Sequence, residues 1–553
     1  MTRDALQRKR LGAYYTPRAI GEILAEWAIR SPSDLVLEPG FGGCDFLEAC
    51  RDRLADLGAA NPLAQLFGCD IDPAAVRFLG SRLGLVAVNG RFVLSDFISL
   101  KPQDLLSTRF DVVIGNPPYV SNHNTDVNQR KTVRDLIANH AFKLPATSSL
   151  WAYFVLHSLS FLAPKGRLAF VLPLALLTAE YSRGLRNYLQ GHFSRVVIVI
   201  VRSRLFRSEG TDEISVILLA DQFGGGPSPS IDVVEANSSD DLRRILIGGL
   251  PNNGANVRRL SKNWATSLLD EAARSSMDYF ISRNACVDLK CLSQIRIGLV
   301  TGANKFFALS KSSAEAGGLY PDSVSPVLAK LPKSPGLWFR TADQARLVRE
   351  DLSCLLVSPD SQGMATRSSP IRQYLASMPR TLRRTNVTFG KREPWYGVDD
   401  GFIPEAFLSY MHHDGPRLII NSAGINCLNS IHRLTFKNIS PLQKLLAAVS
   451  LQTTLSQLSA ELVGRTYGGG ILKHEPQEAG QILLAFPLDL PERDVRATAR
   501  LVDRLLRAGK RDQAREAADS LILNPQSFAK TCEELVILRS ALVHARERRR
   551  PQK

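Results

Sequence analysis

Short apolar runs recur in the first part of the chain, and each ends in polar, glycine or proline residues. The runs lack the alternation of a half-exposed strand, and their length suits strands that are buried on both faces. They are DLVLEP (34–39), AQLFGCD (64–70), GRFVLSD (90–96) and FDVVIGNPPY (110–119). We predict that these four segments form buried parallel strands.

Segments with helical spacing of apolar residues separate these runs. Residues 46–58 follow the first run, and residues 72–84, with a proline in their first turn, follow the second. Three further strands are predicted at 166–173, 194–201 and 213–220, with helices at 147–164 and 179–190. The segment FGGGPSPS (223–230) is predicted to be a loop. Strands that alternate with helices predict a Rossmann-like doubly wound α/β sheet of about seven strands, which ends near that loop.

Ligands of such a sheet bind beyond the C-terminal ends of its strands. The segment EPGFGG (38–43) follows the first strand, and Gly40 and Gly42 permit a tight turn and the close approach of a ligand. This signal is weak alone. Many glycine-rich turns are only turns, and a nucleotide or nicotinamide site is the common alternative, although neither a Walker lysine nor GxGxxG spacing is present.

Aspartates stand at two further strand ends. Asp70 is placed to accept hydrogen bonds from a ribose diol, and the alternative role of helix N-cap suits Asp72 better. Asp96 is able to bind the exocyclic amine of an adenine while Phe97 packs on the ring, although an ordinary loop aspartate explains Asp96 equally well.

The sharpest signal is Asn116-Pro117-Pro118-Tyr119, directly after a predicted strand. Two prolines remove two N–H donors and leave carbonyls available, and the asparagine adds another carbonyl beside an aromatic ring. An exocyclic amine held by two such acceptors keeps its lone pair less delocalised and becomes a better nucleophile. The alternative, a rigid proline turn, gives no reason for asparagine in front and tyrosine behind.

Positive charge is concentrated in the second part of the chain. The 553 residues contain 69 Lys and Arg against 53 Asp and Glu, a net charge of +16. Residues 1–240 hold 25 basic and 24 acidic side chains, whereas residues 241–553 hold 44 and 29. Such a surplus favours a surface that binds a polyanion, because each cation that neutralises a phosphate releases counterions. A basic but merely solvated surface is the alternative.

Cysteine, histidine and apolar patterns exclude several classes. The eight cysteines include no CxxC pair, and the nine histidines show no HExxH or zinc-finger spacing, so we expect neither a metal site nor disulfides. The N-terminus has no apolar signal region, and no apolar stretch is long enough to span a membrane. We expect a cytoplasmic, nucleoid-associated protein with no membrane partner.

Together, these motifs resemble the gamma-class adenine-N6 DNA methyltransferases of restriction-modification systems, which use S-adenosyl-L-methionine. GAYYTP (12–17) resembles their N-terminal cofactor motif, and EPGFGG resembles their glycine loop. CDID (69–72) and DF (96–97) resemble the ribose and adenine motifs, and NPPY resembles the catalytic motif. The resemblance covers nearly the whole chain.

The resemblance implies a cofactor site made of Tyr15, Thr16, Glu38, Gly40, Gly42, Asp70, Ile71, Asp96 and Phe97. In this assignment Tyr15 and Thr16 border the cofactor, and Glu38 faces its methionine end. One departure is present. Cys44 stands where the family usually has glycine, and Asp45 follows where the family has a small residue.

The catalytic set expected from this resemblance is Asn116, Pro117, Pro118 and Tyr119, with Phe206 as a second aromatic that covers the base. The target adenine is paired and stacked within a duplex, so the enzyme must rotate it out. Asn116 and the Pro117 carbonyl would then accept the amine protons while the amine attacks the sulfonium methyl group, without metal or covalent intermediate. An ordinary core role is the alternative for Phe206.

The predicted catalytic domain spans residues 1–240, a DNA target-recognition domain of mixed α+β structure spans 245–490, and a helical segment with a basic tail spans 491–553. Four stretches of the second domain resemble the family's recognition region. They supply the candidate DNA-binding residues Lys305, Lys391, Arg392, Trp395, Arg465, Tyr467 and Lys473. Cations suit phosphate contacts, and aromatic rings suit packing against sugars. Structural loops are the alternative for any one of them.

The expected partner is double-stranded DNA. Only eleven residues precede GAYYTP, and we find no convincing nuclease constellation, so we expect a separate restriction endonuclease to act on the same site. Two other functions remain open. One is a methyltransferase that acts on RNA adenine or on protein glutamine, and the other is a catalytically silent DNA-binding subunit.

Overall fold

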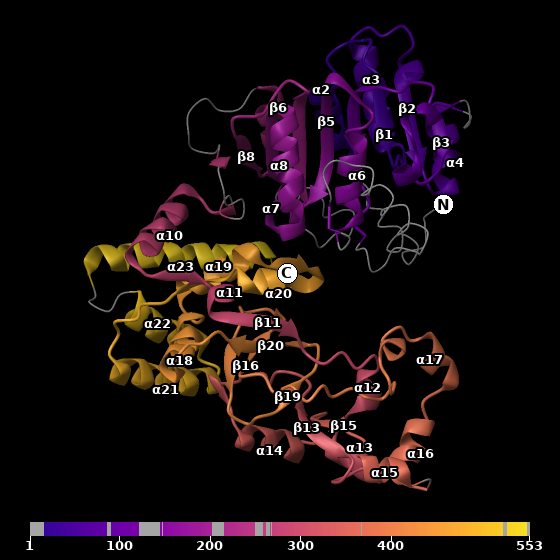
Figure 1. The fold of residues 1–553 in the computed structure, drawn as a ribbon. Coiled ribbons are helices and arrows are strands. Elements are labelled where there is room, and N and C mark those ends of the chain that lie inside the picture. The colour runs from indigo at the N-terminus through magenta and orange to yellow at the C-terminus, as the bar shows by residue number, and fades with distance from the viewer. Residues whose placement is uncertain are drawn as a thin grey trace. The chain divides into compact units, whose positions relative to one another are not determined.

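The computed structural model describes residues 16–85, 90–120, 144–145, 148–201, 215–248, 258–260, 266, 268–366, 368–523 and 528–549. The chain forms two compact units, residues 1–267 and 268–553 (Figure 1). Within the described ranges, no helix combines the length and the apolar character needed to cross a bilayer.

A large sheet forms the centre of the first unit, and its strands follow the order β3-β2-β1-β4-β5-β7-β6-β8-β9. The strands are β1 (Val36–Pro39), β2 (Leu66–Asp70), β3 (Phe92–Leu94), β4 (Phe110–Gly115), β5 (Leu162–Pro173), β6 (Phe193–Val201), β7 (Ser215–Phe223), β8 (Ile231–Ala236) and β9 (Arg258–Leu260). Strands β1 to β5 run parallel, whereas β7 lies antiparallel between β5 and β6. In the middle of the sheet, Val36 pairs with Leu66 on one side and with Val112 on the other.

All seven strands predicted from the sequence are present, and the prediction of a Rossmann-like α/β sheet is confirmed. The prediction of about seven strands that end near residue 223 was wrong, because the described sheet has nine. The loop at 223–230 leads into β8, which pairs in parallel with β6 from Val196 and Ile231 onward. Charged residues Asp232 and Glu235 interrupt the apolar residues of β8, so this segment lacks the continuous apolar run by which the other strands were predicted.

Helices cover the sheet and share its core. Helices α2 (Arg18–Ala28), α3 (Asp45–Asp56), α4 (Pro73–Leu83) and α9 (Ser239–Ile247) bury their apolar residues in one cluster with the strands. Helices α6 (Leu150–Ser158) and α8 (Arg183–His192) lie in front of the sheet in Figure 1. Every residue of α6 is buried, as expected for a helix that is apolar on all sides.

The second unit contains a five-stranded sheet and a smaller four-stranded sheet. The larger has the order β11-β20-β16-β18-β14, and the smaller has the order β12-β15-β13-β19. The strands of the larger sheet are β11 (Ser293–Ile297), β20 (Ile431–Phe436), β16 (Ala406–Ser409), β18 (Leu418–Asn421) and β14 (Trp338–Phe339). Those of the smaller sheet are β12 (Ala308–Leu309), β15 (Leu355–Val357), β13 (Val324–Leu328) and β19 (Asn426–Cys427).

The C-terminal helices belong to this second unit. They are α21 (Glu492–Arg507), α22 (Arg511–Ile522) and α23 (Ala529–Arg549), and they pack on α18 (Pro441–Ser450) and α19 (Thr454–Val463). Two ion pairs with buried carboxylates connect these helices. Asp519 of α22 binds Arg539 of α23 at 3.0 Å, and Glu461 of α19 binds Arg549 of α23 at 2.9 Å. The three-part division drawn from the sequence stays a prediction.

Three histidines are held in the interior of the second unit. The Nε2 atom of His412 lies 3.1 Å from Nδ1 of His474, whose own Nε2 lies 2.9 Å from the Ala460 carbonyl. The imidazole of His432 bonds the backbone carbonyl of His474 at 2.8 Å. Burial, and then a neighbouring imidazole and nearby arginines, lower the pKa of His412 well below its usual range and lower the pKa of His474 to about 4.

Acid is therefore expected to destabilise this unit. His474 is neutral when folded, but it binds a proton in the unfolded chain below about pH 6.5, so its contribution is present above that pH and is lost as the pH falls toward 4. The full loss is roughly 3 kcal/mol. Urea unfolding at pH 7.5 and pH 5 checks this. The variant His474→Gln should lose less stability over that interval than the natural chain, and equal losses would contradict the assignment.

Candidate active site at the sheet edge

The carboxyl ends of β1, β2 and β4 lie at one edge of the first sheet, because these strands are parallel neighbours. The glycine loop after β1 is tied to the end of β2. The Gly40 N–H donates to the Cys69 carbonyl at 2.6 Å, and the Gly42 N–H donates to Asp70 Oδ2 at 2.7 Å. The other Asp70 oxygen accepts from the Asp72 N–H at 2.8 Å. Asp70 therefore shapes the loop, while Asp72 caps α4 through the Ala74 N–H.

Glu38 is buried beneath this loop, with 3% of its surface exposed. Among the described residues, its Oε2 atom has no hydrogen-bond partner. Burial, and then the carboxylates of Asp45 and Asp70, raise the pKa of Glu38 well above its usual range. A buried carboxyl oxygen without a donor is costly, so Glu38 marks a place where a ligand with a hydrogen-bond donor would be stabilised.

The loop backbone has left-handed conformations at Gly40, Gly42 and Cys44, with φ values of 84°, 45° and 67°. A Cβ atom added at Gly40 or Gly42 would meet nothing nearer than 4.0 Å. The two glycines are therefore needed for their φ angles, and they leave open space over the loop for a ligand.

Cys44 occupies the position where the family usually has glycine, and its positive φ shows why glycine suits it. We expect Cys44→Gly to be more stable than Cys44→Ala by about 1 kcal/mol, because an L-residue in this conformation carries a steric cost. Cys50 is a matched control, since it is equally buried but lies within α3. There, Gly should be less stable than Ala by about 1 kcal/mol. Urea unfolding of the four variants gives both differences, and the same sign at both positions would contradict this account.

Arg82 binds Asp45, the second residue that departs from the motif of the family that the sequence resembles. Its guanidinium binds Asp45 Oδ1 at 2.7 Å and Glu48 Oε2 at 2.6 Å, and it also donates to the Gly43 carbonyl. Asp45 is therefore part of an ion-pair network between α3 and α4 that holds the far side of the glycine loop.

Asn116 follows β4 directly and is half-buried. Its Nδ2 atom donates to Thr16 Oγ1 at 3.2 Å. This contact joins the predicted catalytic motif to the predicted N-terminal cofactor motif across 100 residues of sequence. It also sets the orientation of the Asn116 amide, since the nitrogen end faces Thr16. Pro117 is buried, whereas Pro118 and Tyr119 are partly exposed.

The remaining predicted cofactor residues differ in exposure. Ile71 is 49% exposed at the end of β2, so it offers an apolar face at the site edge. Phe97 is 2% exposed, and its ring packs on those of Phe154 and Phe161 at 5.1 and 5.3 Å. The Asp96 carboxylate accepts from the Ile98 N–H at 3.1 Å. Tyr15, Phe206 and the side chain of Tyr467 lie outside the described residues.

In the second unit, four of the predicted DNA-binding residues have partners within the protein. Arg392 donates to the carbonyls of Val300 and Thr301. Lys473 binds Glu475 at 2.7 Å, and Arg465 binds the buried Glu478. Trp395 packs among the rings of Phe306, Phe307 and Phe389. Lys305 and Lys391 are exposed.

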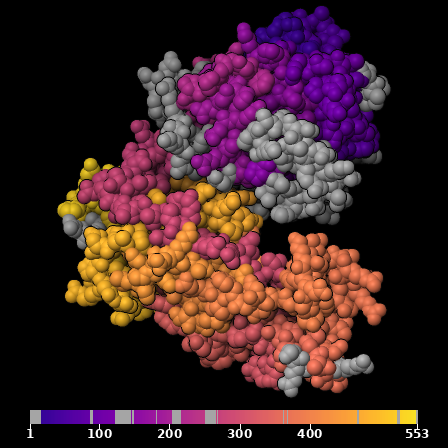
Figure 2. Space-filling model, viewed as in Figure 1, coloured from indigo at the N-terminus to yellow at the C-terminus, as the bar shows by residue number. Residues whose placement is uncertain are grey.

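Helix α17 (Arg380–Thr385) was missed as a candidate, although three arginines in six residues are a visible signal. Arg380 and Arg384 are exposed, and Arg383 lies over the Trp395 ring at 5.7 Å. The same aromatic cluster joins α17 to α12 (Asn304–Phe307), which carries Lys305. We call Lys305, Arg380, Arg384 and Lys391 the basic patch. The lobe that carries it is orange in Figure 2.

The strand order, the glycine loop and the polar residues at one sheet edge define a Rossmann-like methyltransferase. Residues 4–224 match the family "N-6 DNA Methylase", and residues 261–523 match the family "Type II methyltransferase M.Eco57I, C-terminal domain". The chain thus combines an N6-adenine DNA methyltransferase domain with a C-terminal domain of the M.Eco57I type, which confirms the resemblance inferred from its motifs.

Individual relatives are similar over most of the chain. Type II methyltransferase M.AccI from Acinetobacter calcoaceticus is 23% identical, over 85% of this chain and 84% of the relative. Type II methyltransferase M.XamI from Xanthomonas campestris pv. amaranthicola is 26% identical over the same shares. The solved structure of the type IIL restriction-modification enzyme MmeI in complex with DNA covers 100% of this chain and 78% of that chain, with a TM-score of 0.53 and 13% identity. This structural likeness concerns the fold.

Proposed function

We propose that this enzyme transfers a methyl group from S-adenosyl-L-methionine to the N6 amine of an adenine that is rotated out of double-stranded DNA. The observation that carries the proposal is the convergence, at one sheet edge, of Glu38, Asp70 and Asn116 with the hydrogen bond from Asn116 to Thr16. Membership in the N6-adenine family supports both the cofactor and the target.

The residues at this edge fit the proposed cofactor. The unpartnered Glu38 oxygen suits a donor such as the ammonium of the methionine end. The Asp70 oxygens already accept backbone N–H groups, but a carboxylate oxygen has a second lone pair that suits a ribose hydroxyl. The exposed face of Ile71 suits the adenine ring. When bound, the cofactor supplies an electrophilic methyl group on a positively charged sulfur.

The NPPY segment then receives the target base. The Asn116 side-chain carbonyl and the Pro117 backbone carbonyl accept the two protons of the exocyclic amine, which keeps the nitrogen lone pair available for attack. Tyr119 stacks on the base, and such stacking offsets part of the few kcal/mol needed to rotate a base out of the duplex.

DNA is proposed to be held in part by the basic patch. Four exposed cations around one aromatic cluster suit successive phosphates, and they lie in the part of the chain that has the charge surplus. Arg465 and Lys473 have carboxylate partners, so we assign them a supporting role in the fold around the interface.

Methyl transfer from radiolabelled S-adenosyl-L-methionine to unmodified duplex DNA, RNA and total cell protein, measured in parallel, tests this proposal. Label should enter the DNA and be recovered as N6-methyladenine after digestion. Label in RNA or protein alone would overturn the proposal, and so would the absence of label. Single-molecule sequencing of the methylated DNA then identifies the recognised site.

A separate restriction endonuclease is proposed to act on the same site. In the presence of Mg²⁺, the purified chain should methylate the DNA and leave it uncut. Specific double-strand breaks made by this chain alone would overturn that part of the proposal.

A further inference from the structure

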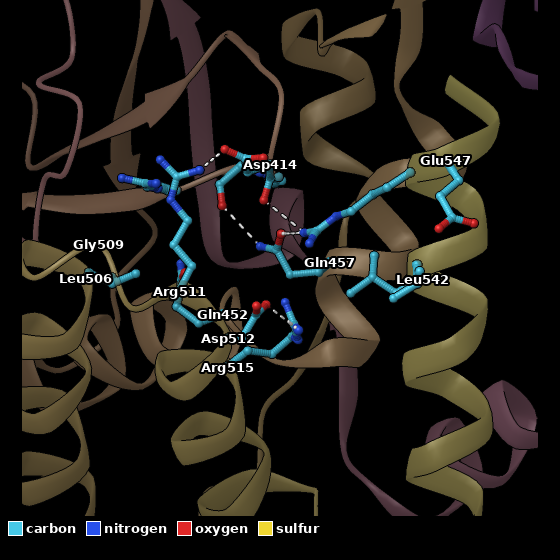
Figure 3. Close-up of a pocket in the computed structure, with 15 residues that line it drawn as sticks. Asp414, Gln452, Gln457, Leu506, Gly509, Arg511, Asp512, Arg515, Leu542 and Glu547 are labelled. Atoms are coloured by element: carbon cyan, nitrogen blue, oxygen red, sulfur yellow. Dashed lines mark hydrogen bonds and ion pairs between the residues drawn. The ribbon is translucent and has the colours of Figure 1, made fainter. Parts of the chain in front are cut away.

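A cavity of about 440 Å³ opens within the second unit, beneath the loop at residues 414–417. Its walls come from α19, α21, α22, α23 and that loop, so it lies where the C-terminal helices pack on the rest of the unit. Figure 3 shows Gln452, Gln457, Arg511 and Arg515 around it. The proposed methyl transfer uses none of these residues.

The lining is rich in arginine. Arg417, Arg511, Arg515 and Arg546 face three carboxyl groups, those of Asp414, Asp512 and Glu547. Two of the carboxylates are paired within the protein, since Asp414 binds Arg511 and Asp512 binds Arg515 at 2.7 Å. Glu547 is exposed, and the Asp512 side chain is 79% exposed. Arg546 also lies 3.5 Å from Glu461, so Arg417 is the arginine of this wall that has no carboxylate partner among the described residues.

Several hydrogen-bond donors of the inner wall have no acceptor. Gln452 is 7% exposed, and its Nε2 atom has no partner among the described residues. The Nε atom of Arg515 is likewise buried and unpartnered there. The guanidinium of Arg417 forms neither an ion pair nor a hydrogen bond in the described part of the chain, and burial alone lowers the pKa of Arg417.

The other polar groups of the wall are held in place by their own hydrogen bonds. Arg546 donates to the Gln457 side-chain oxygen at 3.1 Å and to the Asp414 carbonyl at 2.9 Å. The Gln457 amide nitrogen donates to the Pro416 and Leu451 carbonyls. The unpartnered donors of Arg417, Arg515 and Gln452 therefore lie beside side chains whose positions are fixed by hydrogen bonds.

From this arrangement we propose that the cavity binds a small phosphorylated molecule through a phosphate group. A phosphate oxyanion supplies the acceptors that the Arg417 guanidinium, the Arg515 Nε atom and the Gln452 Nε2 atom lack, and guanidinium groups match its geometry. The cavity volume is in the range of pockets that enclose small ligands. The same chemistry is present in the DNA backbone, but a pocket walled by helices suits a terminal phosphate better than a continuous strand.

Binding of this kind would link the C-terminal helices to the remainder of the second unit. Arg511 and Arg515 come from α22, Gln452 precedes α19, and Arg417 is the last residue of the loop. An anion that bridges them binds only the folded unit, so it must raise the temperature of unfolding.

Calorimetric titration of the full chain with pyrophosphate, together with thermal unfolding in its presence, tests the proposal. Pyrophosphate should bind saturably and raise the unfolding temperature. Arg417→Gln should weaken its binding roughly tenfold or more, because a charge-assisted contact is lost. Gln452→Leu provides a second variant, and it should weaken binding without a change in net charge.

Arg500→Gln is the matched control. It removes the same charge from an exposed position of α21 that is outside the lining, so pyrophosphate should bind it as it binds the natural chain. Absence of saturable binding, or equal affinity in the natural chain and both cavity variants, would overturn the proposal. Displacement of pyrophosphate by a short duplex, with the same loss of DNA binding in Arg417→Gln, would assign the cavity to a backbone phosphate and overturn the small-molecule assignment.

Discussion

Replacing Asn116 by alanine is expected to lower the rate of methyl transfer roughly 100- to 1000-fold, while cofactor affinity stays nearly unchanged. The reason is that the variant removes one of the two proposed acceptors for the amine protons, and such groups act mainly in the transition state. The glycine loop, Glu38 and Asp70 are untouched, so the proposed cofactor contacts remain. Single-turnover methylation of duplex DNA and calorimetric titration with S-adenosyl-L-methionine measure the two effects.

The contact with Thr16 supplies the control for this experiment. Thr16→Val removes the Oγ1 atom that accepts from Asn116 Nδ2, but it leaves the Asn116 carbonyl in place. Its rate should therefore fall less than that of Asn116→Ala. Unchanged turnover in Asn116→Ala would refute the catalytic role of Asn116. A smaller loss in Asn116→Ala than in Thr16→Val would refute the account of how the amide is oriented.

Asp70→Ala is expected to weaken binding of S-adenosyl-L-methionine roughly 10- to 100-fold. The carboxylate accepts the Gly42 N–H at 2.7 Å and the Asp72 N–H at 2.8 Å, so its removal leaves the Gly40 N–H to Cys69 carbonyl bond as the remaining tie of the glycine loop to β2. The proposed contact to the ribose is lost at the same time. At saturating cofactor the methylation rate should change much less, because Asn116 and the two prolines remain.

Asp72→Ala is the matched control for Asp70→Ala. Asp72 is two residues away and is similarly buried, but its carboxylate caps α4 at the Ala74 N–H. Its loss should lower the free energy of unfolding by about 1 kcal/mol and leave cofactor affinity nearly unchanged. Equal losses of affinity in the two variants would show that helix stability, and not the loop contact of Asp70, controls binding.

The seven strands that the sequence predicted are recognisable because each is an apolar run next to glycine, proline or aspartate, and these signals are local. The positions of Asp70 and Asn116 at one edge follow from the same argument, since parallel strands end on the same side of a sheet. The NPPY segment is recognisable from the sequence without knowledge of its tertiary contacts, because two prolines after a strand constrain the backbone by themselves.

Residue pairs that are distant in sequence were not predictable in this way. Nothing local to Arg392 shows that its guanidinium donates to Val300 and Thr301, and nothing near Lys473 shows that its ammonium lies over the ring of Tyr410. A basic residue in a charged segment is read as available for DNA until its partners are known. The exposed arginines of α17 were missed for the opposite reason, because their availability depends on a fold that leaves them uncovered.

By itself, then, the sequence determined the sheet, the order of the motifs and the chemistry of the acceptors after β4, because residue type and spacing act over a few neighbours. Only the tertiary structure decided that Thr16 orients Asn116, and that Arg417, without an acceptor among the described residues, lines a cavity among the C-terminal helices. Each of these depends on contacts between segments far apart in the chain, and chain folding, not local propensity, places such segments together.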